Sequence, residues 1–132
     1  MNRELLNYDI ILTISIAFGN FNYHQRNEIE GTVKHSIYGH AYVSAFLDNE
    51  NGKPKIQPGQ CRIIIKGLPD DLSLSLFTRL EQINNSHHLF YWMVNNEQGI
   101  EQFKKEYNDS YNLKYKGMLS ALKKARDILN TD

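Results

Sequence analysis

The feature that most constrains the fold of this chain is an alternating pattern in residues 29–47. Every second residue from Ile29 onward is apolar or glycine, with the exception of His35. Successive side chains of a strand point to opposite faces, so this pattern predicts one long strand, or two strands hinged at Gly39. The intervening residues are polar in the first half of the segment and aromatic in the second half.

Three further segments show the composition or alternation of strands, and they are residues 9–18, 60–66 and 88–94. Residues 48–54 are rich in Asn, Asp, Gly and Pro, which are turn-forming residues. We therefore expect a hairpin that joins the strand at 29–47 to a return strand at 60–66.

Helical spacing appears in the second half of the chain. Apolar residues recur three and four positions apart over residues 72–83, although the Leu-Ser-Leu-Ser-Leu opening of this segment also fits a strand. Asp70 or Asp71 can cap this helix. A helical stripe follows at residues 100–107, and the last amphipathic helix is predicted at about residues 113–130.

Strands joined by hairpins and followed by clustered helices are typical of an α+β domain. We predict a single domain over residues 1–132, with a mainly antiparallel sheet of about five strands. Two or three helices are expected on one face of the sheet, including the C-terminal amphipathic helix. That helix could approach closely over a set of small residues, which are Gly31, Gly39, Ala41 and Ala45.

Charge and cysteine content exclude several classes of protein. The chain has 15 basic and 15 acidic residues, so it shows no basic face of the kind that binds nucleic acid. No segment approaches the ~18–20 apolar residues of a membrane span. The single cysteine, Cys61, excludes an internal disulfide and favours a reducing compartment, so we expect a cytoplasmic protein.

The five histidines do not form a metal-binding pattern. His87 and His88 are adjacent and would point to opposite faces of a strand, and the chain has no paired cysteines and no His-Glu-x-x-His motif. We therefore predict no metal site and no cofactor. His35, alone among apolar neighbours, is expected to be a core or edge histidine.

No catalytic group is predicted. Cys61 lies in an apolar strand register, where a cysteine usually behaves as a small hydrophobe. The Asp70-Asp71 pair precedes an apolar stripe, so capping explains it better than acid–base chemistry. The sequence thus predicts a protein that is not an enzyme.

The unusual feature is a group of aromatic residues and one histidine around the second half of the alternating segment. It comprises Tyr38, His40, Tyr42 and Phe46, together with Phe21 and Tyr23. One interpretation is a second hydrophobic face covered by a helix. The other is an exposed patch of the composition that protein-binding surfaces favour.

Residues 2–12, 15–21 and 35–43 resemble small bacterial immunity proteins of contact-dependent growth inhibition systems. The resemblance is one of overall sequence texture across roughly residues 1–66, and no motif carries binding residues over. It implies a cytoplasmic, non-enzymatic protein that binds the C-terminal toxin domain of its own system and blocks its active site or substrate access. Such toxins are often nucleases.

Two other functions remain open at this point. One is a small-molecule-binding or enzymatic domain with a site lined by His35, His40 and Tyr42. The other is a phage-encoded inhibitor of host defence, which composition does not distinguish from an immunity protein. The oligomeric state is not predicted.

Overall fold

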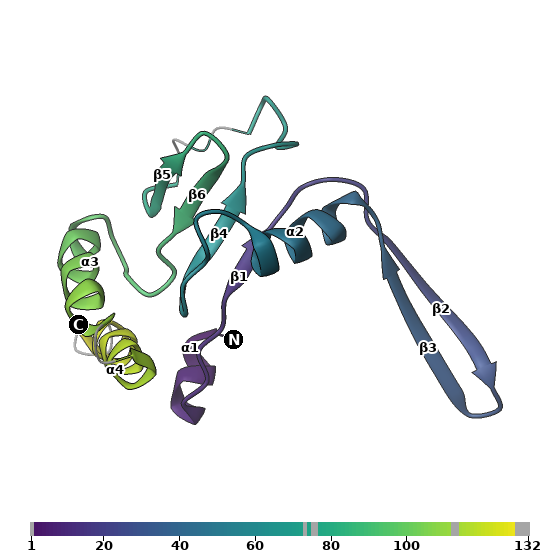
Figure 1. Ribbon diagram of the computed structural model, residues 1–132, viewed down its shortest axis with the longest axis horizontal. Coiled ribbons are helices and arrows are strands. Elements are labelled where there is room, and N and C mark those ends of the chain that lie inside the picture. The colour runs from purple at the N-terminus through teal and green to yellow at the C-terminus, as the bar shows by residue number, and fades with distance from the viewer. Residues whose placement is uncertain (1, 73, 75–76, 112–113, 129–132) are drawn as a thin grey trace.

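The computed structural model describes residues 2–72, 74, 77–111 and 114–128 of the 132-residue chain, and it has an α+β fold (Figure 1). Its elements are α1 (Asn2–Leu5), the 3₁₀ helix η1 (Leu6–Tyr8), β1 (Ile14–Ile16), β2 (Asn22–Ile29), β3 (Thr32–Tyr38), α2 (His40–Asn51), β4 (Cys61–Ile64), β5 (Leu80–Asn84), β6 (His87–Phe90), α3 (Gln98–Tyr111) and α4 (Lys114–Asp127). The α+β class predicted from the sequence is confirmed.

The larger sheet has four strands in the order β1-β4-β6-β5. β1 runs parallel to β4, with Ile14 opposite Cys61, whereas β4, β6 and β5 pair antiparallel. The chain leaves β1 through a long excursion and returns beside it, which is the kind of crossover that parallel pairing requires. This mixed four-stranded sheet, with a separate two-stranded sheet, differs from the single, mainly antiparallel sheet of about five strands that we expected.

β2 and β3 form the second sheet, an antiparallel hairpin that projects from the rest of the molecule (Figure 1). We call this hairpin the arm. Its turn contains Gly31, whose φ of 81° is a conformation that glycine adopts readily. Among the arm residues whose side chains are described, Ser36 is half-buried and the others are exposed. Asparagines at positions 20, 22 and 27 are typical of a loop, but residues 22–29 form the strand β2 because they pair with β3.

The prediction of one long strand over residues 29–47 is correct only for residues 32–38, which form β3, because Ile29 ends β2 and residues 30–31 form the turn of the arm. The hinge is at Gly39, which has a φ of 135°, and the residues after it form the helix α2. Ala41, Ser44, Ala45 and Asp48 lie at helical spacing and face the body of the protein. The apolar and small residues of residues 40–47 fit both periods over this short length, and packing on β1 selects the helix.

The hairpin predicted at residues 48–54 is therefore wrong. α2 continues through Asn51 and ends where the Gly52 amide donates a hydrogen bond of 2.9 Å to the Asp48 carbonyl. The next strand, β4, pairs with β1 and β6 instead of returning along the alternating segment.

The helix predicted over residues 72–83 is also wrong in its described part. Residues 80–84 form β5, and Asp70 and Asp71 lie in a turn with no α-helix after it in the described residues before β5. Residues 73, 75 and 76 lie outside the described part. β5 forms because its hairpin partner β6 supplies a ladder of hydrogen bonds, which outweighs the helical spacing.

The remaining predicted elements are correct in place but differ in length. The strands expected at 9–18 and 60–66 contain the shorter strands β1 and β4, and the strand expected at 88–94 overlaps β6, which begins one residue earlier and ends at Phe90. α3 includes the stripe at 100–107, and α4 matches the C-terminal helix within the described residues.

The hydrophobic core lies between α3, α4, η1 and the segment after β6. Its buried members are Leu6, Tyr91, Met93, Val94, Ile100, Phe103, Tyr107, Met118 and Leu122. α4 packs against α3 and η1, so it does not cover the small residues that we expected it to approach. Gly31 instead lies at the tip of the arm, and Gly39 at its base.

Candidate functional site

Helix α2 is amphipathic in the reverse of the usual sense. A surface helix normally turns apolar side chains inward and polar ones outward. The inner face of α2 carries Ala41, Ser44 and Ala45, which are half-buried, and the buried Asp48. Its outer face carries four large apolar side chains that are 45–55% exposed, namely Tyr42, Val43, Phe46 and Leu47.

These four residues form a continuous stripe, which we call the α2 stripe. They are spaced i, i+1, i+4 and i+5, so they share one side of the helix. The rings of Tyr42 and Phe46 stack with centroids 6.5 Å apart and an interplanar angle of 22°. Residues 35–47 contain no Asp, Glu, Lys or Arg, so no charged side chain of this segment interrupts the stripe. A large exposed apolar patch of this kind marks an interaction surface.

A buried polar network fixes α2 to the main sheet through Asp48. One carboxylate oxygen, Oδ2, accepts hydrogen bonds from Ser15 Oγ at 2.8 Å and from Arg62 Nε at 2.9 Å. The other, Oδ1, lies 2.8 Å from His87 Nε2. Arg62, which is 1% exposed, also donates to the carbonyls of Asp48 and Pro54. A single side chain of α2 is thereby bonded to β1, β4 and β6.

The electrostatics of the network favour the ionised carboxylate. Burial raises the pKa of Asp48, but the hydrogen bonds from Ser15, Arg62 and His87 outweigh it and hold that pKa below its ordinary value. His87 Nδ1 lies 3.1 Å from Asn84 Oδ1. This Asn84 atom is the side-chain oxygen and not the side-chain nitrogen, because it also accepts a hydrogen bond from the Ser86 amide. Both ring nitrogens of His87 therefore lie within hydrogen-bonding distance of side-chain oxygens.

This network is structural rather than catalytic in its geometry. The side chains of Asp48, Arg62 and His87 are each less than one-tenth exposed, and their polar groups are bonded to one another. A buried charge that loses its partner is costly, so the network opposes any tilting of α2 away from the sheet. The α2 stripe is thus held on a rigid support, which a binding surface needs if little entropy is to be lost on binding.

The sequence does not predict this network, because Asp48 opens a segment of turn-forming residues. A signal was present in Arg62, a charged residue in the middle of the apolar run of residues 61–65. Such a residue in an inner strand needs a buried partner. The sequence does not say which of the acidic residues supplies it.

The arm is joined to α2 at a tight elbow around Gly39. The amide of Ala41, in the first turn of α2, donates to the Asn20 carbonyl at 3.2 Å. A Cβ atom placed on Gly39 would lie 2.4 Å from that same carbonyl oxygen. Any side chain at this position would therefore separate the base of the arm from the start of α2.

One face of the arm carries a mixture of apolar and aromatic side chains. Tyr23 pairs with Ile37 across the two strands, and Val33 and His35 follow on the same face. The rings of Tyr23 and His35 stack at 5.6 Å, and the Tyr23 hydroxyl is hydrogen-bonded to His35 Nδ1. No third strand of the described chain pairs with the arm.

The six predicted binding residues are all exposed, and they are Phe21, Tyr23, Tyr38, His40, Tyr42 and Phe46. The interpretation as a second hydrophobic face covered by a helix is wrong. The residues do not share one strand face, however. Tyr23 and Tyr38 lie on the arm and Phe21 directly precedes it, whereas His40, Tyr42 and Phe46 lie on α2.

Two other residues were singled out, His35 and Cys61. His35 is at a sheet edge rather than in the core, since it lies on the two-stranded arm, and it is bonded to Tyr23. Cys61 is 4% exposed, and burial raises the pKa of its thiol to about 11, as expected for an unreactive small hydrophobe. In the described part of the chain, no three His, Cys, Asp or Glu side chains are grouped to hold a metal ion.

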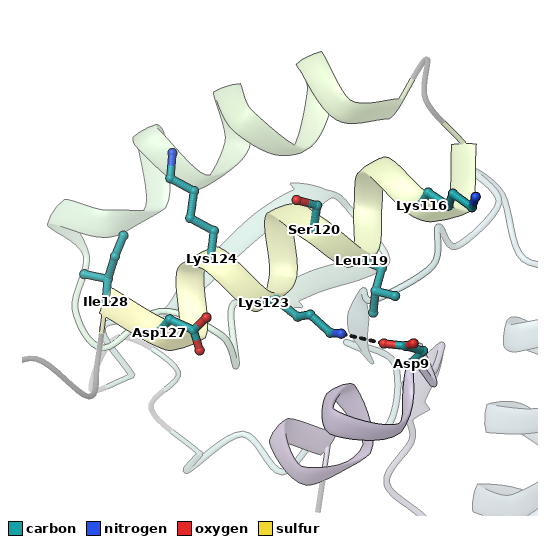
Figure 2. Close-up of a pocket in the computed structure, with 8 residues that line it drawn as sticks. All are labelled: Asp9, Lys116, Leu119, Ser120, Lys123, Lys124, Asp127 and Ile128. Atoms are coloured by element: carbon teal, nitrogen blue, oxygen red, sulfur yellow. Dashed lines mark hydrogen bonds and ion pairs between the residues drawn. The ribbon is translucent and has the colours of Figure 1, made fainter.

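A hollow of about 750 Å³ elsewhere in the molecule lies along α4. Figure 2 shows its lining residues on α4 and Asp9. Lys123 reaches across to Asp9 with an ion pair of 2.5 Å. The hollow is a shallow, open groove, and its lining includes none of the residues of the α2 stripe or the arm.

Comparison of the chain with protein-family models, curated proteins and solved structures gives no match. Within the residues that the structure describes, no helix has both the length and the apolar character needed to cross a membrane.

Proposed function

We propose that this chain is an immunity protein that binds a cognate bacterial toxin domain and blocks its active site or substrate access. The observation that carries the proposal is the reversed amphipathicity of α2, which presents four large apolar side chains on a rigidly anchored helix. The resemblance of residues 1–66 to immunity proteins supplies the identity of the partner. The toxin is a nuclease in this proposal, and the protein acts in the cytoplasm without turnover of its own.

The exposed apolar side chains on α2 and the arm favour a protein partner. Five aromatic side chains of the surface are about half exposed, and they are Phe21, Tyr23, Tyr38, Tyr42 and Phe46. Tyr23 and Ile37 share one face of the arm, whereas Tyr38 lies on the other. A partner that contacts α2 and one face of the arm therefore covers only part of this set.

The composition of the surface also matches that of binding hot spots. Tyrosine and other aromatic residues supply large contact area at low cost in side-chain entropy, and they dominate the energy of many interfaces. Nucleic acid would instead need a basic surface, and residues 35–47 carry no lysine or arginine.

The two other candidate functions are less well supported. A small-molecule or enzymatic site at His35, His40 and Tyr42 would need these side chains around a cavity, but they are exposed on the arm and on α2. A phage-encoded inhibitor of host defence would use the same α2 stripe, so only the identity of the partner separates it from an immunity protein.

A growth assay tests the proposal. The proposal predicts a toxin gene directly upstream of this one, and the C-terminal domain of that toxin is expressed in bacteria alone, with the wild-type chain, or with a Tyr42→Ala variant. We expect the wild type to restore growth and the variant to protect less well. The control is Phe77→Ala, which truncates an aromatic side chain of similar exposure away from the α2 stripe. Absence of protection by a folded wild-type chain contradicts the proposal.

A further inference from the structure

The arm is attached to the rest of the protein through two glycines. Gly19 precedes β2 with a φ of 153°, and Gly39 follows β3 with a φ of 135°, and side chains rarely permit either conformation. Each glycine also packs against the other attachment. A Cβ on Gly19 would lie 3.3 Å from His40 Nδ1, and one on Gly39 would lie 2.4 Å from the Asn20 carbonyl oxygen. Two adjacent points of attachment, each at a glycine, are the arrangement of a hinge.

The large side chains beside the elbow do not lock the arm in its position. Figure 1 shows the arm extending away from the other elements, and β3 contacts α2 next to the elbow. Phe18, Phe21 and Tyr38 are 53–58% exposed, so they do not wedge the elbow. The arm itself is a unit, because the ladder between β2 and β3 is supported by the stacking of Tyr23 on His35. It can therefore turn as one body about the two glycines.

The two faces of the arm differ in character. Tyr23, Val33 and Ile37 share one face, which we call the apolar face of the arm. The opposite face carries Arg26 directly across from Lys34. Pressing this pair of charges against an apolar surface would remove their hydration, which is costly. Only the apolar face is therefore suited to cover apolar side chains.

The α2 stripe lies within reach of the apolar face. A strand rises ~3.3 Å per residue and an α-helix rises ~1.5 Å. Counted from Gly39 along their own elements, Ile37 and Val43 both lie roughly 6–7 Å away. His35 and Leu47 both lie roughly 12–13 Å away on the same count. A turn about the hinge that lays the arm along α2 would bring these pairs together.

The charges of such a closed arrangement are compatible. Arg26 and Lys34 stay on the outward face, in contact with water. The acidic positions of the arm, Glu28 and Glu30, lie by its turn, roughly 23 Å or more from the elbow, whereas α2 is roughly 18 Å long. The exposed Glu50 on α2 therefore meets no acidic residue of the arm.

We propose that the arm is a hinged lid, which in the free protein closes over the α2 stripe with its apolar face inward. The open form seen in the structure is then the form that presents the stripe to a partner. Because lid and stripe belong to one chain, the lid acts at an effective concentration in the mM range. Toxin binding requires opening, so the fraction of open molecules scales the apparent affinity; this coupling rests on the proposed function, whereas the lid does not.

Disulfide trapping in a Cys61→Ala background tests the lid. One variant carries His35→Cys with Leu47→Cys, and the matched control carries Lys34→Cys with Leu47→Cys. The two arm positions are neighbours on opposite faces, and both are exposed. Under mild oxidation at low protein concentration, we expect the first pair to form an intramolecular disulfide at least tenfold faster than the control pair. The cross-linked form should also bind less of the dye ANS than its reduced form, because the stripe is covered.

Three outcomes overturn the lid. The first pair could fail to cross-link, or both pairs could cross-link at the same rate while the variants remain folded by circular dichroism. Cross-linking that leaves ANS binding unchanged would show that the stripe is not covered. A wild type that protects cells although the lid is overturned leaves the immunity function standing, and a lid that closes in a chain that does not protect overturns the immunity function alone.

Discussion

Removal of the Asp48 carboxylate is the perturbation for which the structure gives the clearest magnitude. In an Asp48→Ala variant, Arg62 keeps its charge at 1% exposure but loses the hydrogen bond from its Nε. Ser15 and His87 lose their bonds to the same carboxylate. Breaking a buried ion pair by removing one partner costs ~3–5 kcal/mol, because the other charge stays buried and uncompensated.

That loss is a large fraction of the stability of a chain of this length. At ~0.05–0.15 kcal/mol per residue, a domain of this size has a free energy of unfolding of roughly 7–20 kcal/mol. Asp48→Ala should therefore lower the urea midpoint strongly without changing the slope of the transition. The assay is equilibrium urea unfolding followed by circular dichroism and by the fluorescence of Trp92.

A double-mutant cycle identifies the cause of the loss. Replacing Arg62 by Met in the Asp48→Ala background removes the stranded charge, so this second change should recover more than ~1 kcal/mol. Glu81→Gln serves as the control, since Glu81 and Lys104 form an ion pair of 2.7 Å that is 30–39% exposed. A pair this exposed contributes ~0–1 kcal/mol. A loss below about 1 kcal/mol for Asp48→Ala, or no recovery in the double variant, refutes the buried-charge argument.

The remaining predictions concern pH, packing and reactivity. The pKa of Asp48 is lower in the folded state, so the stabilisation it provides is present above the unfolded pKa of ~3.9 and is lost as pH falls through the folded pKa. When the free energy of unfolding in urea is measured against pH, it should fall less steeply at acid pH for Asp48→Asn than for the wild type. Equal slopes would contradict this. Gly59→Ala should lower the melting temperature, since Gly59 has a φ of 83° and its Cβ would lie 2.7 Å from Leu122 Cδ1; an unchanged melting temperature would show that Leu122 moves aside. Iodoacetamide at pH 8 should label Cys61 slowly in the folded protein and rapidly in urea, because burial raises the pKa of its thiol to about 11; rapid labelling of the native protein would disprove this.

The helices at the C-terminus were predictable because their signal is local. Apolar residues at helical spacing run through α3 and α4, and the side chains of that stripe are the ones that pack in the core. The α+β class and the positions of β1, β4 and β6 followed in the same way from local pattern and composition. Their lengths did not, since strand ends depend on where partner strands stop.

The alternating segment misled for a physical reason. Over residues 40–47 the apolar and small residues fit a period of two and a helical period equally well, and the stripe on α2 is apolar on the outside. A sequence argument assigns apolar residues to the inside, so it cannot distinguish a covered strand face from a helix whose binding surface is exposed. The hinge at Gly39 was predictable, because its φ of 135° is a backbone conformation that glycine adopts readily and residues with a side chain rarely adopt.

The aromatic surface was predictable in its residues but not in its architecture. Its six members were chosen for composition, and all six are exposed. The Asp48 network that supports α2 was not predictable, because its members come from four elements far apart in sequence, with Ser15 on β1, Asp48 on α2, Arg62 on β4 and His87 on β6. Only the position of Arg62 within an apolar strand pointed to it.

The central claim is that the α2 stripe is the surface that binds the toxin. Isothermal titration calorimetry of the proposed cognate toxin domain against the wild type, Phe46→Ala and Phe77→Ala tests it most directly. The account predicts that Phe46→Ala loses ~2 kcal/mol of binding free energy, roughly thirtyfold in affinity, while Phe77→Ala binds like the wild type. Equal affinities for a folded Phe46→Ala variant and the wild type would contradict the claim.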